Sequence, residues 1–289
     1  MNIKDLLVLS CFILIHSAGI TQEKAAYKIY TSAGATTDYT DMAEKAGRAD
    51  VIFFGELHDN PIGHWLQFEL TKDLFAIHGE HLKIGAEMFE ADNQLILNEY
   101  LLGLISESRF ESEARLWPNY QTDYKPILEF ARANNLSFIA TNIPRRYASV
   151  VASNGFDGLK DLSKKALTYI APLPVAYDPE LEGYKSMLNM GHGMGDNENF
   201  PKAQAIKDAT MAHFISDNMK KKDVMLHLNG AYHSQNFEGI VWYLTKENKR
   251  TSILTIHTVL QDDINELNED YKNSADFILV VPTSMTKTY

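Results

Sequence analysis

Short apolar runs recur along the chain and alternate with stretches of mixed polar and apolar residues. The runs are nearly all apolar and do not alternate, which is typical of strands buried on both faces. They cover Val51–Glu56, Lys83–Phe89, Ser137–Asn142, Val224–Asn229, Ser252–Ile256 and Phe277–Val281. Between them, apolar residues fall at helical spacing, after Pro61 and over Tyr124–Ala133, Ala203–Met219 and Gly239–Lys246. This alternation predicts an α/β fold in which helices flank both sides of a mainly parallel sheet.

The segment from Asn154 to Phe200 departs from this pattern because it has no strong strand signal. It contains several prolines and then a stretch rich in glycine and methionine. Insertions of this length between core elements are usually functional or mobile. We predict a helical insertion at residues 154–200, a flap over the carboxyl ends of the strands, within one domain of residues 20–289. A lobe that only covers core surface is the alternative.

Residues 1–19 have the pattern of a signal peptide. Lys4 precedes an apolar run over Leu6–Ile15, which is too short to span a bilayer but suits a signal-peptide core. The small residues Ser17-Ala18-Gly19 follow at the expected cleavage place. We expect an exported protein, periplasmic or associated with the cell envelope. Lipid modification of Cys11 is the second alternative.

Charge and cysteine content narrow the chemistry. The net charge of −11 argues against a nucleic-acid backbone as the main partner. Cys11 is the only cysteine, so a chain cleaved after Gly19 offers no thiolate to a metal or a haem. Any metal must then be held by histidine, carboxylate, tyrosine or methionine side chains.

The tetrad G-x-x-H occurs twice, and each copy ends an apolar run. The copies are Gly55-Glu56-Leu57-His58 and Gly230-Ala231-Tyr232-His233. In open α/β sheets, ligands bind just outside the carboxyl ends of the strands. Because His58 and His233 both follow such strands, we predict that they lie at the same edge of the sheet and form one composite site. Two unrelated strand-end histidines that cap loops are the alternative.

The residues around the tetrads suit metal-assisted chemistry. Glu56 and His58 share a face if the strand persists, and with His233 they could bind a divalent metal and leave a position open for water. Glu87 directly follows its strand and is either a functional carboxylate or a buried structural one paired with arginine. Arg145 lies at a predicted helix start, where a cation opposes the macrodipole, so we expect an anion nearby.

The flap offers a different set of ligands. Histidine, methionine and tyrosine are the side chains that bind haem iron when cysteine is absent. Methionines at this spacing are also common as adaptable core filler. The flap residues of these types are Tyr177, Tyr184, Met187, Met190, His192 and Met194.

Taken together, the motifs resemble the ChaN-like haem-binding uptake family, which is grouped with the Tiki and erythromycin-esterase-like proteins. The resemblance extends from about Tyr27 to Pro282 and rests on V-I-F-F-G-E-L-H-D-N-P-I-G-H-W at Val51–Trp65, G-A-E-M-F-E-A-D-N at Gly85–Asn93, N-I-P-R-R at Asn142–Arg146 and N-G-A-Y-H at Asn229–His233. It implies an α/β core with a helical insertion, export, and a role in haem or iron uptake.

The resemblance also implies roles for particular residues. In the wider superfamily, two G-x-x-H motifs with acidic and arginine residues form a presumed metal-dependent hydrolytic centre, and the matching positions here are Glu56, His58, Glu87, Arg145 and His233. Family members often carry a His-Cys-Gly tract in the flap, and His192 in Gly191-His192-Gly193 is the nearest match. Tyr177 and Tyr184 are the proposed haem-ligating tyrosines, and Lys185 is the expected partner of a haem propionate.

Two functions therefore compete, and whether the protein is an enzyme stays open. The first is an exported protein that binds haem for haem or iron uptake, with a second copy of itself and outer-membrane uptake machinery as partners. The second is a metal-dependent hydrolase of peptidase or esterase type. There Glu56 or Glu87 would act as base on a metal-bound water, and Arg145 would steady the oxyanion. A structural or adhesive protein would leave the charged residues at the strand ends unexplained.

Overall fold

The computed structural model describes residues 24–190 and 198–289. Its centre is an eight-stranded sheet with the strand order β2-β1-β8-β7-β3-β6-β4-β5. The strands are β1 Lys28–Thr31, β2 Thr36–Thr37, β3 Val51–Glu56, β4 Leu82–Glu90, β5 Ser137–Asn142, β6 Val224–Gly230, β7 Ile253–Gln261 and β8 Phe277–Pro282. Strands β3 to β8 are parallel where they pair, whereas β1 and β2 add an antiparallel hairpin at the edge next to β8. The predicted α/β class with a mainly parallel sheet is confirmed.

Strand β3 lies in the middle of the sheet because it is apolar on both faces. Its residues pair in register with β6 on one side and β7 on the other, for example Val51 with Met225 and with Ile253. All six positions of β3 are buried. Since side chains alternate along a strand, Ile52 packs into the core of one face of the sheet and Phe53 into the core of the other.

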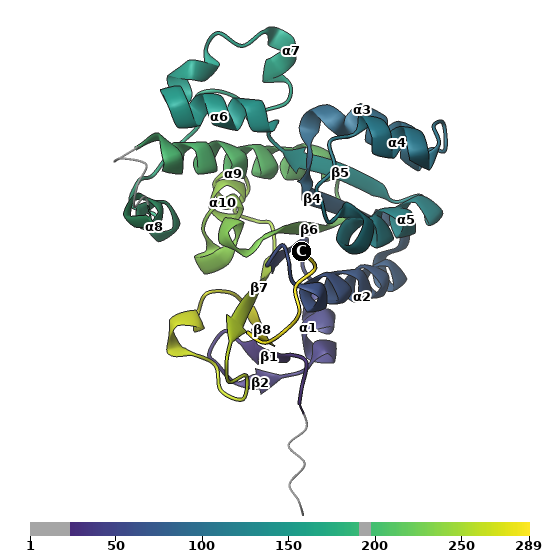
Figure 1. Ribbon diagram of the computed structural model, residues 1–289, viewed down its shortest axis with the longest axis vertical. Coiled ribbons are helices and arrows are strands. Elements are labelled where there is room, and N and C mark those ends of the chain that lie inside the picture. Colours follow the sequence, from purple (N-terminus) through teal and green to yellow (C-terminus); the bar gives the residue numbers. More distant parts are fainter. Residues whose placement is uncertain (1–23, 191–197) are drawn as a thin grey trace, which may run out of the picture.

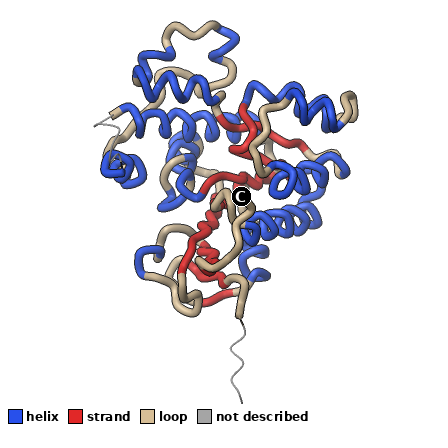
Figure 2. Tube along the Cα trace, viewed as in Figure 1, coloured by secondary structure: helices blue, strands red, loops and turns tan. Residues whose placement is uncertain are grey.

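Helices cover both of these faces, as Figures 1 and 2 show. Residues of α1, α2, α3, α4 and α5 pack in the larger core cluster, and α9 and α10 pack in the cluster on the opposite face. The helices are α1 Tyr39–Ala46, α2 Pro61–His78, α3 Gln94–Leu101, α4 Glu107–Glu113, α5 Lys125–Ala133, α6 Arg145–Asn154, α7 Lys164–Leu167, α8 Glu182–Met190, α9 Asn199–Asn218 and α10 Ile240–Glu247. None of the described helices is long and apolar enough to cross a membrane.

The start of α2 shows how local sequence sets the loop after β3. Pro61 occupies the first helical turn, where a missing backbone N–H leaves no hydrogen bond unmade. Asn60 is the N-cap, and its Oδ1 accepts a hydrogen bond of 3.0 Å from the backbone N–H of Gly63. This cap ends the loop that carries His58 and therefore limits where that side chain can lie.

Where the structure describes it, the insertion consists of short helices joined by loops. Between Gly155 and Met190 the chain forms α7, α8 and short turns, with no strand. Buried residues of this segment, such as Leu159 and Ile170, pack with Val151 of α6 and Ile206 of α9. Figure 1 shows α7 next to α6 and α8 next to one end of α9. The insertion thus begins at the end of α6 and is held by α6 and α9.

Candidate functional site

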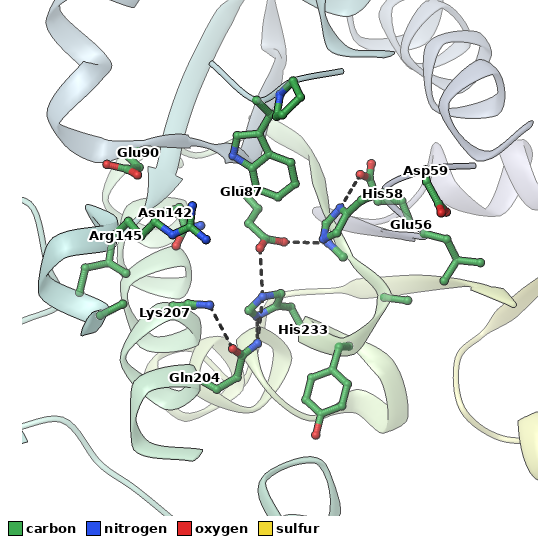
Figure 3. A pocket seen from close by; sticks show the side chains of 18 of the residues that line it. Glu56, His58, Asp59, Glu87, Glu90, Asn142, Arg145, Gln204, Lys207 and His233 are labelled. Atoms are coloured by element: carbon green, nitrogen blue, oxygen red, sulfur yellow. Dashed lines mark hydrogen bonds and ion pairs between the residues drawn. The ribbon is translucent and has the colours of Figure 1, made fainter. Parts of the chain in front are cut away.

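The residues that the sequence places at the strand ends line one pocket of about 1150 Å³. Figure 3 shows their side chains pointing toward one another from neighbouring elements. The lining residues include Glu56 and His58 after β3, Glu87 and Glu90 of β4, Asn142 of β5, Arg145 and Arg146 of α6, and His233 of the short 3₁₀ turn Ala231–His233 after β6. The parallel sheet therefore brings both tetrads to one edge, and the alternative of two unrelated strand-end histidines does not apply.

Glu56 and His58 form one half of the site. The Nδ1 atom of His58 lies 2.9 Å from Glu56 Oε1. Gln67 Nε2 and the Tyr124 hydroxyl donate to the same carboxylate at 2.6 Å each. Burial favours a higher pKa for Glu56, but the imidazoles of His58 and His64 outweigh it and lower the pKa to about 2. Glu56 is therefore an anion that holds the His58 ring through Nδ1.

A second layer of polar residues supports this pair from behind. His64 is buried, with Nε2 3.4 Å from Glu56 Oε1 and Nδ1 3.1 Å from Asp123 Oδ2. Asn119 donates to the backbone carbonyl of His58 at 2.9 Å and to Asp123 Oδ2 at 2.6 Å. Asp123 and Asn119 come from a π-helical turn and its N-cap, a rare conformation that is frequent at functional sites. The loop carrying His58 is thus fixed by side chains distant in the sequence.

Glu87, His233 and Asp208 form the other half of the site. His233 Nε2 lies 3.1 Å from Glu87 Oε1, and His233 Nδ1 lies 2.5 Å from Asp208 Oδ1. Burial alone would lower the pKa of His233, but the two carboxylates raise it to about 10. The neighbouring imidazoles outweigh burial in lowering the pKa of Glu87, whereas burial dominates and raises the pKa of Asp208. His233 is therefore an imidazolium that donates from both ring nitrogens.

Gly230 lets the two halves approach. A Cβ atom at this position would lie 2.8 Å from His58 Nε2 and 3.5 Å from Glu87 Oε2. The backbone N–H of Gly230 donates to Glu87 Oε2 at 2.8 Å. The first residue of the second tetrad thus needs to be glycine for reasons of space, since the φ of −57° at Gly230 is open to any residue.

Cations line the wall opposite His58, as Figure 3 shows for Arg145 and Lys207. Among the described residues, the guanidinium of Arg145 has no ion-pair partner, and Lys207 Nζ contacts only Gln204 Oε1 at 3.3 Å. In contrast, Arg146 is paired with Asp92 at 2.7 Å. Two unpaired positive charges facing a cavity form a surface that attracts an anion.

Three of the predicted haem contacts lie away from this pocket. Tyr184 is 3% exposed and donates to Asp208 Oδ2 at 2.8 Å, so its hydroxyl is already used inside the protein. Tyr177 packs against Phe156 and Tyr184, and Lys185 is paired with Glu180 at 2.9 Å. In this structure burial and the hydrogen bond to Asp208 occupy the Tyr184 hydroxyl, and its assignment to the iron stays a prediction. His192 lies outside the described residues.

Several residues of the site were missed by sequence reasoning. Asp208, Gln204 and Lys207 lie on α9, where their spacing is that of any polar positions in a helix. Trp117 lies in a loop, and its ring contacts the His58 ring edge to face with centroids 4.8 Å apart. The sequence signal that existed was Gln204 and Asp208 at positions i and i+4, which share one helix face.

The described part of the chain does not support the predicted metal site. Within residues 24–190 and 198–289, no group of three or more histidine, cysteine, aspartate or glutamate side chains is arranged to hold a metal ion. His233 has both ring nitrogens against carboxylates, which leaves no lone pair for a metal. A divalent metal at Glu56, His58 and His233 stays a prediction.

The chain belongs to the haem-binding uptake family ChaN of the Tiki superfamily, whose sequence model matches residues 42–244. Among solved structures, the chain is similar to ChaN of Campylobacter jejuni, a protein described with cofacial haem. The TM-score is 0.67 at 16% identity, covering 88% of this chain and 96% of that one. At this identity the likeness shows the fold alone.

Two further relatives share less with the chain. Protein RETICULATA-RELATED 5, chloroplastic, of Arabidopsis thaliana is 27% identical over 131 residues, which are 43% of this chain and 18% of that protein. An erythromycin esterase, EreC, in its open conformation matches with a TM-score of 0.46 at 12% identity, covering 88% of this chain and 82% of that one. Membership of the ChaN family supports haem as the ligand of this chain.

Proposed function

We propose that this protein binds haem in the strand-end pocket and takes part in haem or iron uptake. The observation that carries the proposal is the pair of unpaired cations, Arg145 and Lys207, on the pocket wall opposite His58. Haem has two carboxylates at one edge of a flat apolar ring, and it needs such an arrangement of charges to be held in one orientation.

The pocket also meets the other requirements of a porphyrin. Ligand pockets usually enclose about 300–1,000 Å³, and this one, with about 1150 Å³, is somewhat larger. Trp117, Leu116 and Ile143 supply apolar lining, and imidazoles of His58, His233 and His257 face or border the cavity. Histidine is a common axial ligand of haem iron. The residues present therefore fit haem.

The proposal includes export of the protein and a role in haem or iron uptake. The family is described as one of haem-binding uptake, and Leu6–Ile15 has the length and composition of a signal-peptide core. Periplasmic or envelope localisation, a homodimer and contact with outer-membrane uptake machinery are consistent with that role. The similar protein from Campylobacter jejuni is described with cofacial haem, and a second copy of this chain is the partner we propose.

Haem titration of the mature protein tests the proposal. Wild-type protein should show a saturable shift of the main haem absorption band. Arg145→Ala combined with Lys207→Ala should weaken binding about tenfold or more, because a lost charge-assisted hydrogen bond is worth about 1.5–3 kcal/mol. Haem dimethyl ester should bind both proteins alike. Lys185→Ala is the matched control, since that lysine is paired with Glu180 outside the pocket. Absence of saturable binding by wild type would reject haem as the ligand.

A hydrolase is the second candidate, and the Glu56–His58 pair is the observation that favours it. A histidine oriented by a buried carboxylate is a common general base. Glu56 itself, with a pKa of about 2, is a weak base, so His58 is the better candidate for that role. Arg145 lies across the pocket, where it could stabilise an oxyanion. Assays with a panel of esters and peptides, with and without a chelator, should show turnover that is lost in His58→Gln.

A further inference from the structure

We propose that His58 is the axial ligand of the haem iron through Nε2, and that Glu56 is the positioning residue that holds its ring. The assignment rests on the proposed haem-binding function and names the atom that would meet the iron. It moves the iron ligand from the flap to the first G-x-x-H tetrad.

The hydrogen bonds of His58 leave the required nitrogen free. The Glu56 carboxylate is buried and accepts hydrogen bonds from Gln67 and Tyr124, so the proton between Glu56 and His58 sits on His58 Nδ1, at 2.9 Å. In the neutral ring Nε2 then carries a lone pair, and among the described residues it has no hydrogen-bond partner. Metal-ligating histidines almost always donate their other ring N–H in this way, most often to a carboxylate or a carbonyl.

The other imidazoles of the pocket are less suitable. His233 is 5% exposed, and both of its nitrogens face carboxylates. His257 is 8% exposed and pairs with Ser274 through Nδ1 at 2.8 Å. The His58 side chain is 35% exposed, so His58 is the pocket imidazole that a large flat ligand can reach.

The surroundings of Nε2 are shaped for an approaching group. A Cβ atom at position 230 would lie 2.8 Å from His58 Nε2 and block access to that nitrogen, and glycine has none. Trp117 contacts the ring edge to face and limits its rotation. Arg145 and Lys207 lie across the pocket, where the propionate edge would be held.

Glu56 is held rigidly enough to act as a positioning residue. Its side chain is fully buried, Gln67 donates to Oε2, and Tyr124 donates to Oε1, both at 2.6 Å. A carboxylate bonded to Nδ1–H makes the imidazole a stronger electron donor to the metal. Replacing Glu56 by glutamine should therefore raise the reduction potential of bound haem and lower the iron–histidine stretching frequency, even where binding persists.

Haem titration, followed by absorption and resonance Raman spectroscopy, tests the assignment on the full mature protein. His58→Ala should weaken haem binding at least tenfold and remove the imidazole-type spectrum, and added imidazole should restore that spectrum. His58→Tyr should give a phenolate-type spectrum. Gly230→Ala should weaken binding while keeping both histidines. His81→Ala is the matched control, since His81 is exposed outside the pocket, and it should leave the spectrum unchanged. Circular dichroism checks the fold of each variant.

The outcomes separate this assignment from the proposed function. If wild type binds haem and His58→Ala keeps both its spectrum and its affinity, the assignment is wrong and the haem function stands. A changed spectrum in His192→Ala alone would then return the ligand to the flap. If wild type binds no haem, both the function and the assignment are rejected. An unchanged potential and iron–histidine frequency in Glu56→Gln would remove Glu56 from the positioning role.

Discussion

Replacing Asp208 by alanine should destabilise the protein strongly, because the buried imidazolium of His233 then keeps only one of its two carboxylate partners, Glu87. Asp208 is 1% exposed and accepts from His233 Nδ1 at 2.5 Å and from the Tyr184 hydroxyl at 2.8 Å. Removing one partner of a buried ion pair costs about 3–5 kcal/mol. The unpaired Tyr184 hydroxyl adds about 1–3 kcal/mol, so we expect a loss near the upper end of the first range or above it.

Urea unfolding at pH 7, followed by far-UV circular dichroism, measures this loss. Asp217→Ala is the matched control because Asp217 is an exposed aspartate on the same helix, where a substitution should change stability by less than about 0.5 kcal/mol. Asp208→Asn should lose less than alanine, since the amide oxygen can still accept one hydrogen bond. A loss below about 1 kcal/mol for Asp208→Ala would show that His233 is neutral in the folded protein and that the charged arrangement is wrong.

Three other predictions concern pH, packing of the site and processing. Since the pKa of His233 is raised from 6.5 to about 10, its contribution to stability is fully present below pH 6.5 and is lost as the pH rises through about 10. Urea unfolding at pH 7 and 10 should therefore show a larger decline in wild type than in His233→Asn, and equal declines would contradict it. Tyr124→Phe should lose about 1–3 kcal/mol in the same assay, because the hydroxyl donates to buried Glu56; an unchanged midpoint would show that this hydrogen bond adds nothing. Amino-terminal sequencing of protein from its native host should begin within residues 20–23, and an intact Met1 or a lipid on Cys11 would refute that cleavage.

The sheet was predictable from the sequence because its parallel strands are apolar on both faces. The run at Val51–Glu56 matches β3 residue for residue. The predicted end of β7 at Ile256 was too early, since the strand continues to Gln261. His257 and Thr258 interrupt the apolar pattern there, yet both are buried against neighbouring elements. A pattern of residue types cannot distinguish a polar residue with a buried partner from one that ends a strand.

Only those residues of the candidate site that directly follow a strand could be predicted from the sequence. The G-x-x-H tetrads place His58 and His233 at the edge of the sheet because parallel strands end together. Asp208 could not be found in this way, since a carboxylate inside a helix is ordinary in sequence and its burial depends on the packing of α9. The use of the Tyr184 hydroxyl likewise depends on a partner that is distant along the chain.

Two consecutive residues of the second tetrad contact the flap and the pocket: Tyr232 contacts α8 of the flap, and His233 lines the pocket. The Tyr232 hydroxyl donates to the backbone carbonyl of Gly183 at the start of α8 and lies 3.0 Å from the Ser186 hydroxyl, while the next residue, His233, lies in the pocket wall. A displacement of α8 must therefore break contacts to the neighbour of a site histidine. A fluorescent label at Leu188, which is 45% exposed on α8, would then report on occupancy of the pocket from outside it, without any change to the residues that meet the ligand.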